Sequence, residues 1–375
     1  MKYLTEYRNP QAAQTLVAEI RKLATQRWRI MEVCGGQTHN LLKYGIESEL
    51  TDVVELIHGP GCPVCVTPAE IIDIAQQISL QPSTILATFG DMLRVPGTAQ
   101  SLNQTRASGG DVRIVYSPVD AVELARLNPD LDVVFLGVGF ETTAPSTALA
   151  VLQAEQLRLD NFSVLVSHVR VLPAMRIILE SSKSRLQGFL AAGHVCTITG
   201  LEEYQDLVDT YEIPVVITGF EPIDLLQGIQ SCVQMLEHGS PRLLNCYPRS
   251  VKRGGNVNAM KLIDEVYQIV DQSWRGIGII PAGGLSLKPD YRKYDAWSRF
   301  VGNRAPVNPT ETECRSAEVL QGLIKPPECS AYGKTCKPAH PLGAPMVSSE
   351  GACAAYYRYR MSNESQTEKA PLIDG

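Results

Sequence analysis

The strongest constraint on the fold is a three-part unit that recurs between residues 28 and 218. A unit has a short apolar run rich in β-branched residues, usually a turn containing glycine or proline, and then a helical segment. Runs that are apolar on both faces fit strands buried between two layers of helices, and helical crossovers join such strands into parallel sheets. The sequence therefore predicts an α/β fold whose strands lie at residues 28–33, 53–57, 84–89, 112–116, 133–136, 163–166, 189–192 and 215–218.

Two of these units share a phrase that favours two related lobes over one eight-stranded sheet. Gly-Phe-Glu-Thr at 139–142 and Gly-Phe-Glu-Pro at 219–222 each follow a buried run and precede a predicted helix. A chain of 375 residues is also long enough for two or three domains. We therefore expect an N-terminal helical segment (1–27), a first α/β lobe (28–136), a second α/β lobe (137–240), a cysteine-containing region (241–361) and a flexible tail (362–375).

The composition excludes several classes of function. With 34 basic and 40 acidic residues the net charge is −6, and no cluster of Lys and Arg of the kind that binds nucleic acid is present. The uncharged apolar runs are far shorter than the roughly 20 residues that span a bilayer, and the N-terminal residues lack the apolar segment of a secretory signal. We therefore expect a cytoplasmic protein that binds neither nucleic acid nor membranes.

Three of the ten cysteines follow the first two predicted strands. Cys34 lies in Glu-Val-Cys-Gly-Gly-Gln-Thr-His, before a helix expected to begin near Asn40, and Cys62 and Cys65 lie in Gly-Pro-Gly-Cys-Pro-Val-Cys. Because ligands of parallel sheets gather at the carboxyl ends of strands, the three thiols are expected to share one crevice. His39 is interpreted either as a base or metal ligand beside Cys34, or as a structural histidine bound by the backbone.

The second cysteine loop ends in a helix-capping signature. Thr67 is predicted as the N-cap, Pro68 as the first helical residue and Glu70 as its partner in the capping box. Cys65 would then lie just outside a helix N-terminus, where free N–H groups stabilise the reactive thiolate. The motif is typical of a redox-active pair. The alternative is that these cysteines are merely small buried residues in tight loops.

Four further cysteines occur late in the chain with the spacing C-x14-C-x6-C-x16-C. Structural zinc sites normally pair their ligands in short C-x2-4-C knuckles, and this set has none. Widely spaced thiolates on loops rich in glycine and proline favour an iron-sulfur cluster, with zinc or unligated thiols as the alternatives. The residues concerned are Cys314, Cys329, Cys336 and Cys353.

Taken together, these motifs resemble the HypD family of NiFe-hydrogenase maturation proteins. The resemblance covers nearly the whole chain, and its motifs are specific in combination. One departure is Gln37, which stands where many members place a histidine. The motifs that carry the resemblance are Gly59-Pro60-Gly61-Cys62-Pro63-Val64-Cys65, Gly139-Phe140-Glu141-Thr142-Thr143, Gly193-His194-Val195, Trp274-Arg275-Gly276 and the four late cysteines.

The resemblance implies two Rossmann-like lobes and a C-terminal region that carries a 4Fe-4S cluster. Such proteins form, with the small partner HypC, a scaffold on which the Fe(CN)2CO group of hydrogenase is assembled, and cyanide arrives from HypE. By position, Cys34 would hold the nascent iron and Cys62 with Cys65 would form the redox pair. The late four cysteines would ligate the cluster. The groups implied to line the crevice are His39, Glu141, Thr142 and His194.

The expected activity is therefore metallocofactor assembly with a redox role, carried out by a chain that is monomeric when alone, rather than conventional enzymatic turnover. Two other functions stay open from the residues themselves. One is a stand-alone thiol-disulfide oxidoreductase, which would survive the loss of Cys34. The other is a zinc-stabilised protein that binds a small molecule, which would be colourless where an iron-sulfur protein is brown.

Overall fold

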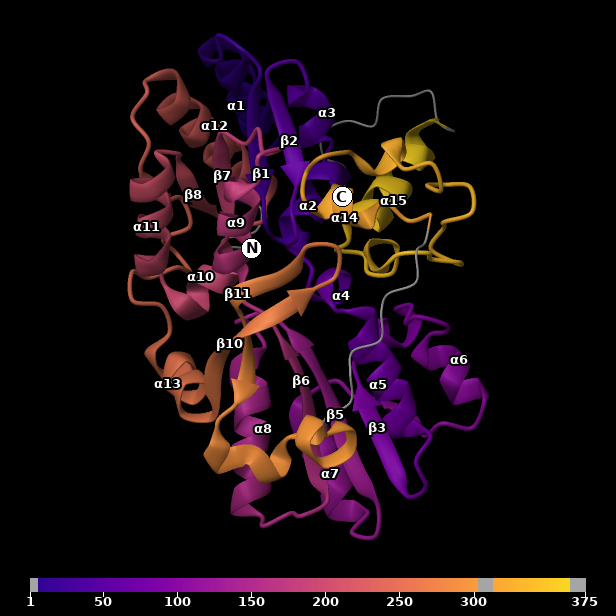
Figure 1. Cartoon of the computed structure of the whole chain (residues 1–375). Coiled ribbons are helices and arrows are strands. Elements are labelled where there is room, and N and C mark those ends of the chain that lie inside the picture. Colours follow the sequence, from indigo (N-terminus) through magenta and orange to yellow (C-terminus); the bar gives the residue numbers. More distant parts are fainter. Residues whose placement is uncertain (1–5, 303–312, 365–375) are drawn as a thin grey trace.

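The computed structural model describes residues 6–302 and 313–364. Two parallel sheets with helices on both faces form the body of the molecule, and a third region built from the C-terminal part lies against one side of them (Figure 1). The predicted α/β fold with two Rossmann-like lobes is confirmed. The eight predicted strands all exist, as β1 to β8.

Sheet A has five parallel strands in the order β2-β1-β7-β8-β9. Helices α1, α3 and α12 cover one face, and α9 and α11 cover the other. The strand order reverses between β1 and β7, and such a reversal opens a crevice at the carboxyl ends of the strands. The strands are β1 (Trp28–Glu32), β2 (Val54–His58), β7 (Gly188–Ala192), β8 (Val215–Thr218) and β9 (Leu243–Asn245). The helices are α1 (Pro10–Leu23), α3 (Ile46–Leu50), α9 (Val171–Glu180), α11 (Glu202–Tyr211) and α12 (Pro222–Glu237).

Sheet B has four parallel strands in the order β4-β3-β5-β6. Helices α5 and α6 pack on one face, and α7 and α8 pack on the other. The strands are β3 (Thr84–Thr88), β4 (Val112–Ile114), β5 (Asp132–Gly139) and β6 (Phe162–His168). The helices are α5 (Ala69–Ser79), α6 (Leu102–Ala107), α7 (Pro118–Leu127) and α8 (Ala144–Gln156).

The chain passes from sheet A to sheet B and then back again. Strands β1 and β2 belong to sheet A, β3 to β6 to sheet B, and β7 to β9 to sheet A. The predicted boundary at residue 136 therefore does not separate the two lobes. A boundary drawn from sequence order assumes that strands consecutive in the sequence share a sheet. In this chain the crossover at α9 returns from sheet B to sheet A.

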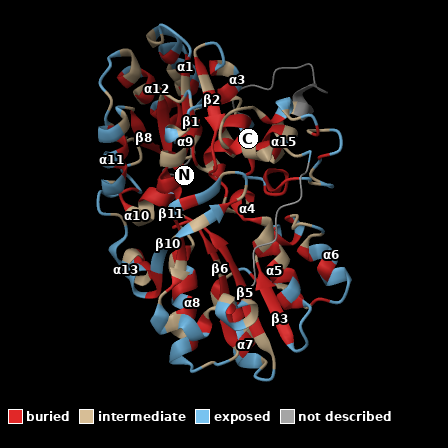
Figure 2. Cartoon of the chain, in the orientation of Figure 1, coloured by how far each residue is buried: buried red, intermediate tan, exposed pale blue. Residues whose placement is uncertain are grey.

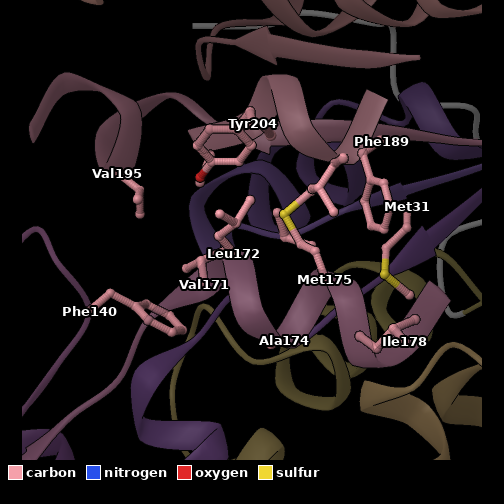
Figure 3. Packing of buried hydrophobic residues seen from close by; sticks show 14 of the residues in the cluster. Met31, Phe140, Val171, Leu172, Ala174, Met175, Ile178, Phe189, Val195 and Tyr204 are labelled. Atoms are coloured by element: carbon pink, nitrogen blue, oxygen red, sulfur yellow. The ribbon is translucent and has the colours of Figure 1, made fainter. Parts of the chain in front are cut away.

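The buried residues concentrate in both sheets and between them (Figure 2). One core cluster joins the lobes, because Met175 and Ile178 of α9 lie close to Phe189 of β7 and Met31 of β1 (Figure 3). The same cluster contains Phe140, which follows β5. Apolar packing therefore holds the carboxyl-terminal edges of the two sheets together.

An antiparallel hairpin and two connecting helices complete the lobes. Strands β10 and β11 lie between the sheets. They belong to the part of the chain after residue 240, for which the sequence predicts no strand. Their bounds are β10 (Tyr267–Trp274) and β11 (Gly278–Leu287), and the helices are α10 (Gly193–Thr199) and α13 (Val257–Val266). The 3-10 turns of the lobes are η1 (Glu6–Arg8), η2 (Gly90–Arg94) and η3 (Pro289–Tyr294), and a π-helical turn is η4 (Trp297–Val301).

The late cysteines lie in the third region, which packs on α2 and α4 beside sheet A. Its elements are α14 (Ser316–Leu320), η5 (Pro326–Glu328), η6 (Ala344–Met346) and α15 (Ala352–Glu364). The contacting helices are α2 (Gly35–Lys43) and α4 (Pro63–Val66). The predicted tail lies largely outside the described residues. Within the described part of the chain, no helix is long and apolar enough to cross a membrane.

Candidate thiol site at the edge of sheet A

Cys34 and the Cys62–Cys65 pair come together because β1 and β2 are parallel neighbours. Glu32 ends β1 and pairs in register with His58, which ends β2. The two cysteine loops then touch directly: the Gly35 N–H donates to the Gly61 carbonyl at 2.9 Å. A side chain on Gly61 would place its Cβ 2.2 Å from the Cys34 nitrogen, so the close approach requires glycine.

Cys62 and Cys65 form a disulfide with their Cα atoms 5.2 Å apart. Cys62 is the N-cap of α4, and its Sγ accepts a hydrogen bond from the Cys65 N–H at 3.3 Å. Both cysteines are buried, at 3 % and 0 % exposure. A sulfur atom must be accessible before an external thiolate can attack it. Burial therefore restricts this pair to partners that enter the crevice.

The predicted caps of this loop are shifted by one residue. Helix α5 begins at Ala69 with Pro68 as its N-cap, while the Thr67 hydroxyl donates to the Pro63 carbonyl. Thr67 thus ends α4 rather than starting α5. Cys65 accordingly lies inside α4, and it is Cys62 that occupies the N-cap. Helix α4 was not predicted, because a helix of four residues is too short to show an apolar periodicity in the sequence.

Cys34 is itself an N-cap, of helix α2, which begins at Gly35 rather than near Asn40. Burial, reinforced by the negative charge of Glu32, raises the pKa of the Cys34 thiol to about 12. On its own the thiol is therefore protonated at neutral pH. A metal cation would reverse this preference, because a thiol that coordinates a metal gives up its proton.

Of the other predicted site residues, His194 is connected to the Cys34 loop through Phe220. It follows β7 and stacks on Phe220, with ring centroids 3.8 Å apart. Phe220 in turn lies over Gly36, where an added Cβ would be 3.1 Å from its ring and 4.0 Å from the Cys34 Sγ. An aromatic wall of Phe220 and His194 therefore flanks the thiol. Burial lowers the pKa of His194, which favours its neutral imidazole.

His39 points to the third region. Its Nδ1 lies 3.3 Å from the Ser349 carbonyl and its Nε2 lies 3.0 Å from the Tyr359 hydroxyl. Burial lowers its pKa. Both ring nitrogens thus have partners that tie α2 to α15, which matches the structural alternative given for this histidine.

Glu141 and Thr142 lie at the carboxyl end of sheet B, in the turn between β5 and α8. Glu141 is buried, and its Oε1 accepts a hydrogen bond from the Val171 N–H at 3.0 Å, which anchors the start of α9. Its Oε2 has no hydrogen-bond partner among the residues that the structure describes. Burial raises the pKa of Glu141 to about 7, so this carboxyl can hold or release a proton near neutrality. Thr142 is half-buried beside it.

The four late cysteines line one small cavity in the third region. Burial, followed by the proximity of the other three thiols, raises the pKa of Cys353 well above its ordinary value. If these thiols lose their protons, the negative charges repel one another unless a cation offsets them. Among the described residues, no three His, Cys, Asp or Glu side chains converge closely enough to hold a single metal ion. The cysteines are Cys314, Cys329, Cys336 and Cys353.

The disulfide and this cavity are neighbours. Helix α4, which contains Cys65, packs against η6, and Pro345 and Met346 of η6 line the cavity. The hairpin turn closes the contact from the other side. Arg275 donates through its backbone N–H to the Val66 carbonyl and through Nε to the Thr67 carbonyl, and Gly276 lies against Ala317 of α14.

Comparison with known proteins identifies the family. Residues 11–360 match the HypD family model, described as the hydrogenase formation hypA family. The chain belongs to the HypD family. Hydrogenase maturation factor HypD of Rhodobacter capsulatus is 45 % identical over 96 % of this chain and 98 % of the relative. HypD of Escherichia coli K12 is 43 % identical over 96 % and 98 %, and HypD2 of Bradyrhizobium diazoefficiens is 42 % identical over 99 % and 100 %.

Three residues shape the site of this HypD-family chain without having been predicted to do so. Gln37, noted above only as a departure from the family, is fully buried, and its Nε2 donates to the Ala191 carbonyl at 3.1 Å, which ties α2 to the end of β7. Phe220 belongs to the repeated phrase, and Glu32 lies within the predicted strand 28–33. A charged residue at the buried end of an apolar run was the one available signal for Glu32.

Proposed function

We propose that this HypD-family chain is a scaffold for assembling the Fe(CN)2CO group of NiFe hydrogenase, in complex with a small HypC-type partner. Hydrogenase maturation is the activity named for its relatives. The observation that carries the finer proposal is that three thiol groups adjoin one another. The Cys34 loop contacts the loop of the Cys62–Cys65 disulfide, and α4 packs this disulfide against η6, which lines the four-cysteine cavity. We propose that it works in the cytoplasm, with a HypE-type donor supplying cyanide.

In this scheme Cys34 holds the substrate iron. Iron with cyanide and carbonyl ligands binds well to a soft thiolate, and the aromatic wall of Phe220 and His194 keeps one side of the site apolar. The thiol loses its proton when the iron binds. Gln37 holds the helix that presents Cys34 through its bond to Ala191.

The two remaining thiol groups supply electrons and structure. The Cys62–Cys65 disulfide is the oxidised form of a couple that takes up two electrons and two protons to give two thiols beside the iron. The four thiols of the cavity are a suitable donor set for a 4Fe-4S cluster, which would supply single electrons when bound. Its four ligands would be Cys314, Cys329, Cys336 and Cys353.

The iron site is tested by the variant Cys34→Ala, purified without oxygen in complex with the HypC-type partner. We expect the variant to lose the infrared bands of cyanide and carbonyl while the iron and sulfide of the cluster stay at wild-type levels. Cys246→Ser is the matched control, because Cys246 is another half-buried free cysteine of the sheet A lobe. Retained bands in Cys34→Ala would refute the assignment of iron to Cys34.

The cluster is tested by metal and sulfide analysis of the wild-type chain and of Cys353→Ser. We expect about four iron and four sulfide per wild-type chain. In the variant we expect loss of both and a lower melting temperature, because metal binding is part of the folding free energy of such regions. Zinc without sulfide would instead establish the zinc-protein alternative. The buried disulfide already disfavours an oxidoreductase that acts on external protein disulfides.

A further inference from the structure

A chain of buried charges connects the Cys34 loop to the third region. It begins with Glu32 and His58, which end the neighbouring strands β1 and β2 and are 0 % and 4 % exposed. The His58 Nδ1 lies 2.8 Å from the Glu32 Oε1. On its other side, the His58 Nε2 lies 3.7 Å from the Oε2 of Glu47, which is 1 % exposed and belongs to α3. Glu32, His58 and Glu47 thus form a row of buried ionisable groups that begins beside the Cys34 loop.

At the first end, Glu32 fixes the backbone of the Cys34 loop. Its Oε2 accepts a hydrogen bond from the Cys34 N–H at 2.8 Å, and its Oε1 accepts one from the Thr38 hydroxyl in the first turns of α2. Hydrogen bonds to a carboxylate are about twice as strong as those between neutral groups. The orientation of Cys34 therefore depends on where the Glu32 carboxylate is held.

At the other end, Glu47 receives three groups from the third region. The Tyr356 hydroxyl donates to Oε1 at 2.6 Å, Lys325 forms an ion pair with the same oxygen, and the Arg360 guanidinium lies 2.9 Å from Oε2. Lys325 precedes η5, which leads into Cys329. Tyr356 and Arg360 belong to α15, the helix whose first turn contains Cys353. All three side chains thus come from segments that carry cavity cysteines.

These charges hold one another in place. Burial lowers the pKa of His58, but the hydrogen bonds and charges of Glu32 and Glu47 outweigh it and raise the pKa to about 9. Burial also opposes ionisation of Glu47, yet His58, Lys325 and Arg360 keep its pKa well below the ordinary value. Removing any one member leaves a buried charge without compensation, which is far more costly than the loss of a surface ion pair.

We propose that Glu32, His58 and Glu47 form a positioning relay: contact of the third region with Glu47 sets the position of Cys34. The relay makes Cys34 rigid only when α15 and the η5 segment are in place. The relay rests on the proposed function only in so far as Cys34 is taken to hold iron. The mechanical connection itself is independent of iron and can be measured on the thiol alone.

The test is the rate at which iodoacetamide alkylates Cys34 in the full-length chain at one fixed pH, followed by mass spectrometry of the Cys34 peptide. The chain is used as purified without oxygen, with its disulfide intact and without the partner. In Glu47→Gln we expect at least about fivefold faster alkylation of Cys34, the lower range of typical couplings between sites. Tyr356→Phe removes a single hydroxyl, so it provides a milder variant that folds, and we expect a smaller increase.

Two controls separate positioning from general destabilisation. Glu237→Gln alters a carboxylate that accepts from the Trp28 Nε1 at the opposite end of β1, and its Cys34 rate is expected to stay within about twofold of wild type. Cys246 serves as an internal reference in every sample, because it is half-buried beside the end of sheet A. Its rate should not change in Glu47→Gln.

The double variant Glu47→Gln/Tyr356→Phe gives the sharpest readout. Because Tyr356 acts through the Glu47 carboxylate, the double variant should alkylate no faster than Glu47→Gln alone. An unchanged Cys34 rate in Glu47→Gln, or an equal acceleration of Cys246, would overturn the relay. Failure of Cys34 to hold iron would appear in the infrared experiment and would leave these rates as predicted, so the two proposals fail separately.

Discussion

His58 and His168 occupy equivalent places in the two sheets, yet their environments have opposite effects. Each ends a parallel strand, β2 in sheet A and β6 in sheet B, and each is at least 96 % buried. Burial alone lowers the pKa of His168 to about 4, whereas Glu32 and Glu47 raise the pKa of His58 to about 9. The fold supplies the same burial at both edges, so the carboxylate partners decide the charge.

The buried carboxylates of the two lobes repeat this contrast. Glu47, beside sheet A, faces His58, Lys325 and Arg360, and its pKa is held well below the ordinary value. Glu141, at the end of sheet B, accepts a hydrogen bond from the Val171 N–H and has a pKa raised to about 7 by burial. The edge of sheet A is thus a fixed ionic network that receives the third region. At the edge of sheet B, burial instead favours the uncharged forms of Glu141 and His168.

The largest test of this contrast is the pair His58→Gln and His168→Gln. His58→Gln leaves Glu32 and Glu47 buried without their shared cation, which should lower the free energy of unfolding by about 3–5 kcal/mol. His168 packs against the Tyr267 ring and has a 3.4 Å contact with the Thr147 hydroxyl, so His168→Gln should cost about 1–2 kcal/mol. Urea denaturation at pH 7 measures both. Equal losses would mean that burial, not charge pairing, dominates at these sites.

The two histidines should also respond to pH in opposite directions. The pKa of His58 is raised, so its contribution to stability is complete below pH 6.5 and is lost as the pH rises through 9. The pKa of His168 is lowered, so its contribution is complete above pH 6.5 and is lost as the pH falls through 4.

Denaturation curves across the pH range test these two windows. The deficit of His58→Gln relative to wild type should shrink between pH 7 and pH 10. The wild type should lose stability relative to His168→Gln as the pH falls from 6.5 to 4. A deficit of His58→Gln that stays constant up to pH 10 would show that His58 is neutral in the folded protein.

The sequence predicted the parts of the fold that depend on local pattern. Eight strands were located because buried parallel strands are continuous apolar runs, and the cysteine loops met because both follow strands of one sheet. The distribution of strands between sheets was not predictable, since no local pattern marks that α9 packs on sheet A after leaving sheet B. Hairpin β10–β11 was missed because its burial is irregular, with exposed residues in both strands.

The candidate site was predicted as a set of thiols but not as an electrostatic environment. The spacing identified the cysteines, since metal and redox chemistry require that residue type in groups. The connection from Glu32 through His58 to Glu47 depends on tertiary structure, because its members lie on three different elements. Glu47 also depends on contacts with Lys325 and with helix α15, which are far away in the sequence. Nothing in the sequence around His58 indicates that this histidine carries a positive charge.

The smallest expected difference comes from two threonine hydroxyls that bond to the contrasted groups. The Thr38 hydroxyl donates to the Glu32 carboxylate, whereas the Thr147 hydroxyl contacts the neutral His168. A hydrogen bond to a charged group contributes about 1.5–3 kcal/mol, and one between neutral groups contributes about 0.5–1.5 kcal/mol. Thr38→Val should therefore lower the free energy of unfolding by about 1 kcal/mol more than Thr147→Val, measured by urea denaturation at pH 7. Both variants keep the β-branched shape, so helix propensity and packing change alike and cancel in the comparison. If Thr147→Val were the more damaging variant, the charge of Glu32 would not be what holds the first turns of α2, and the contrast between the two edges would have to be explained by packing.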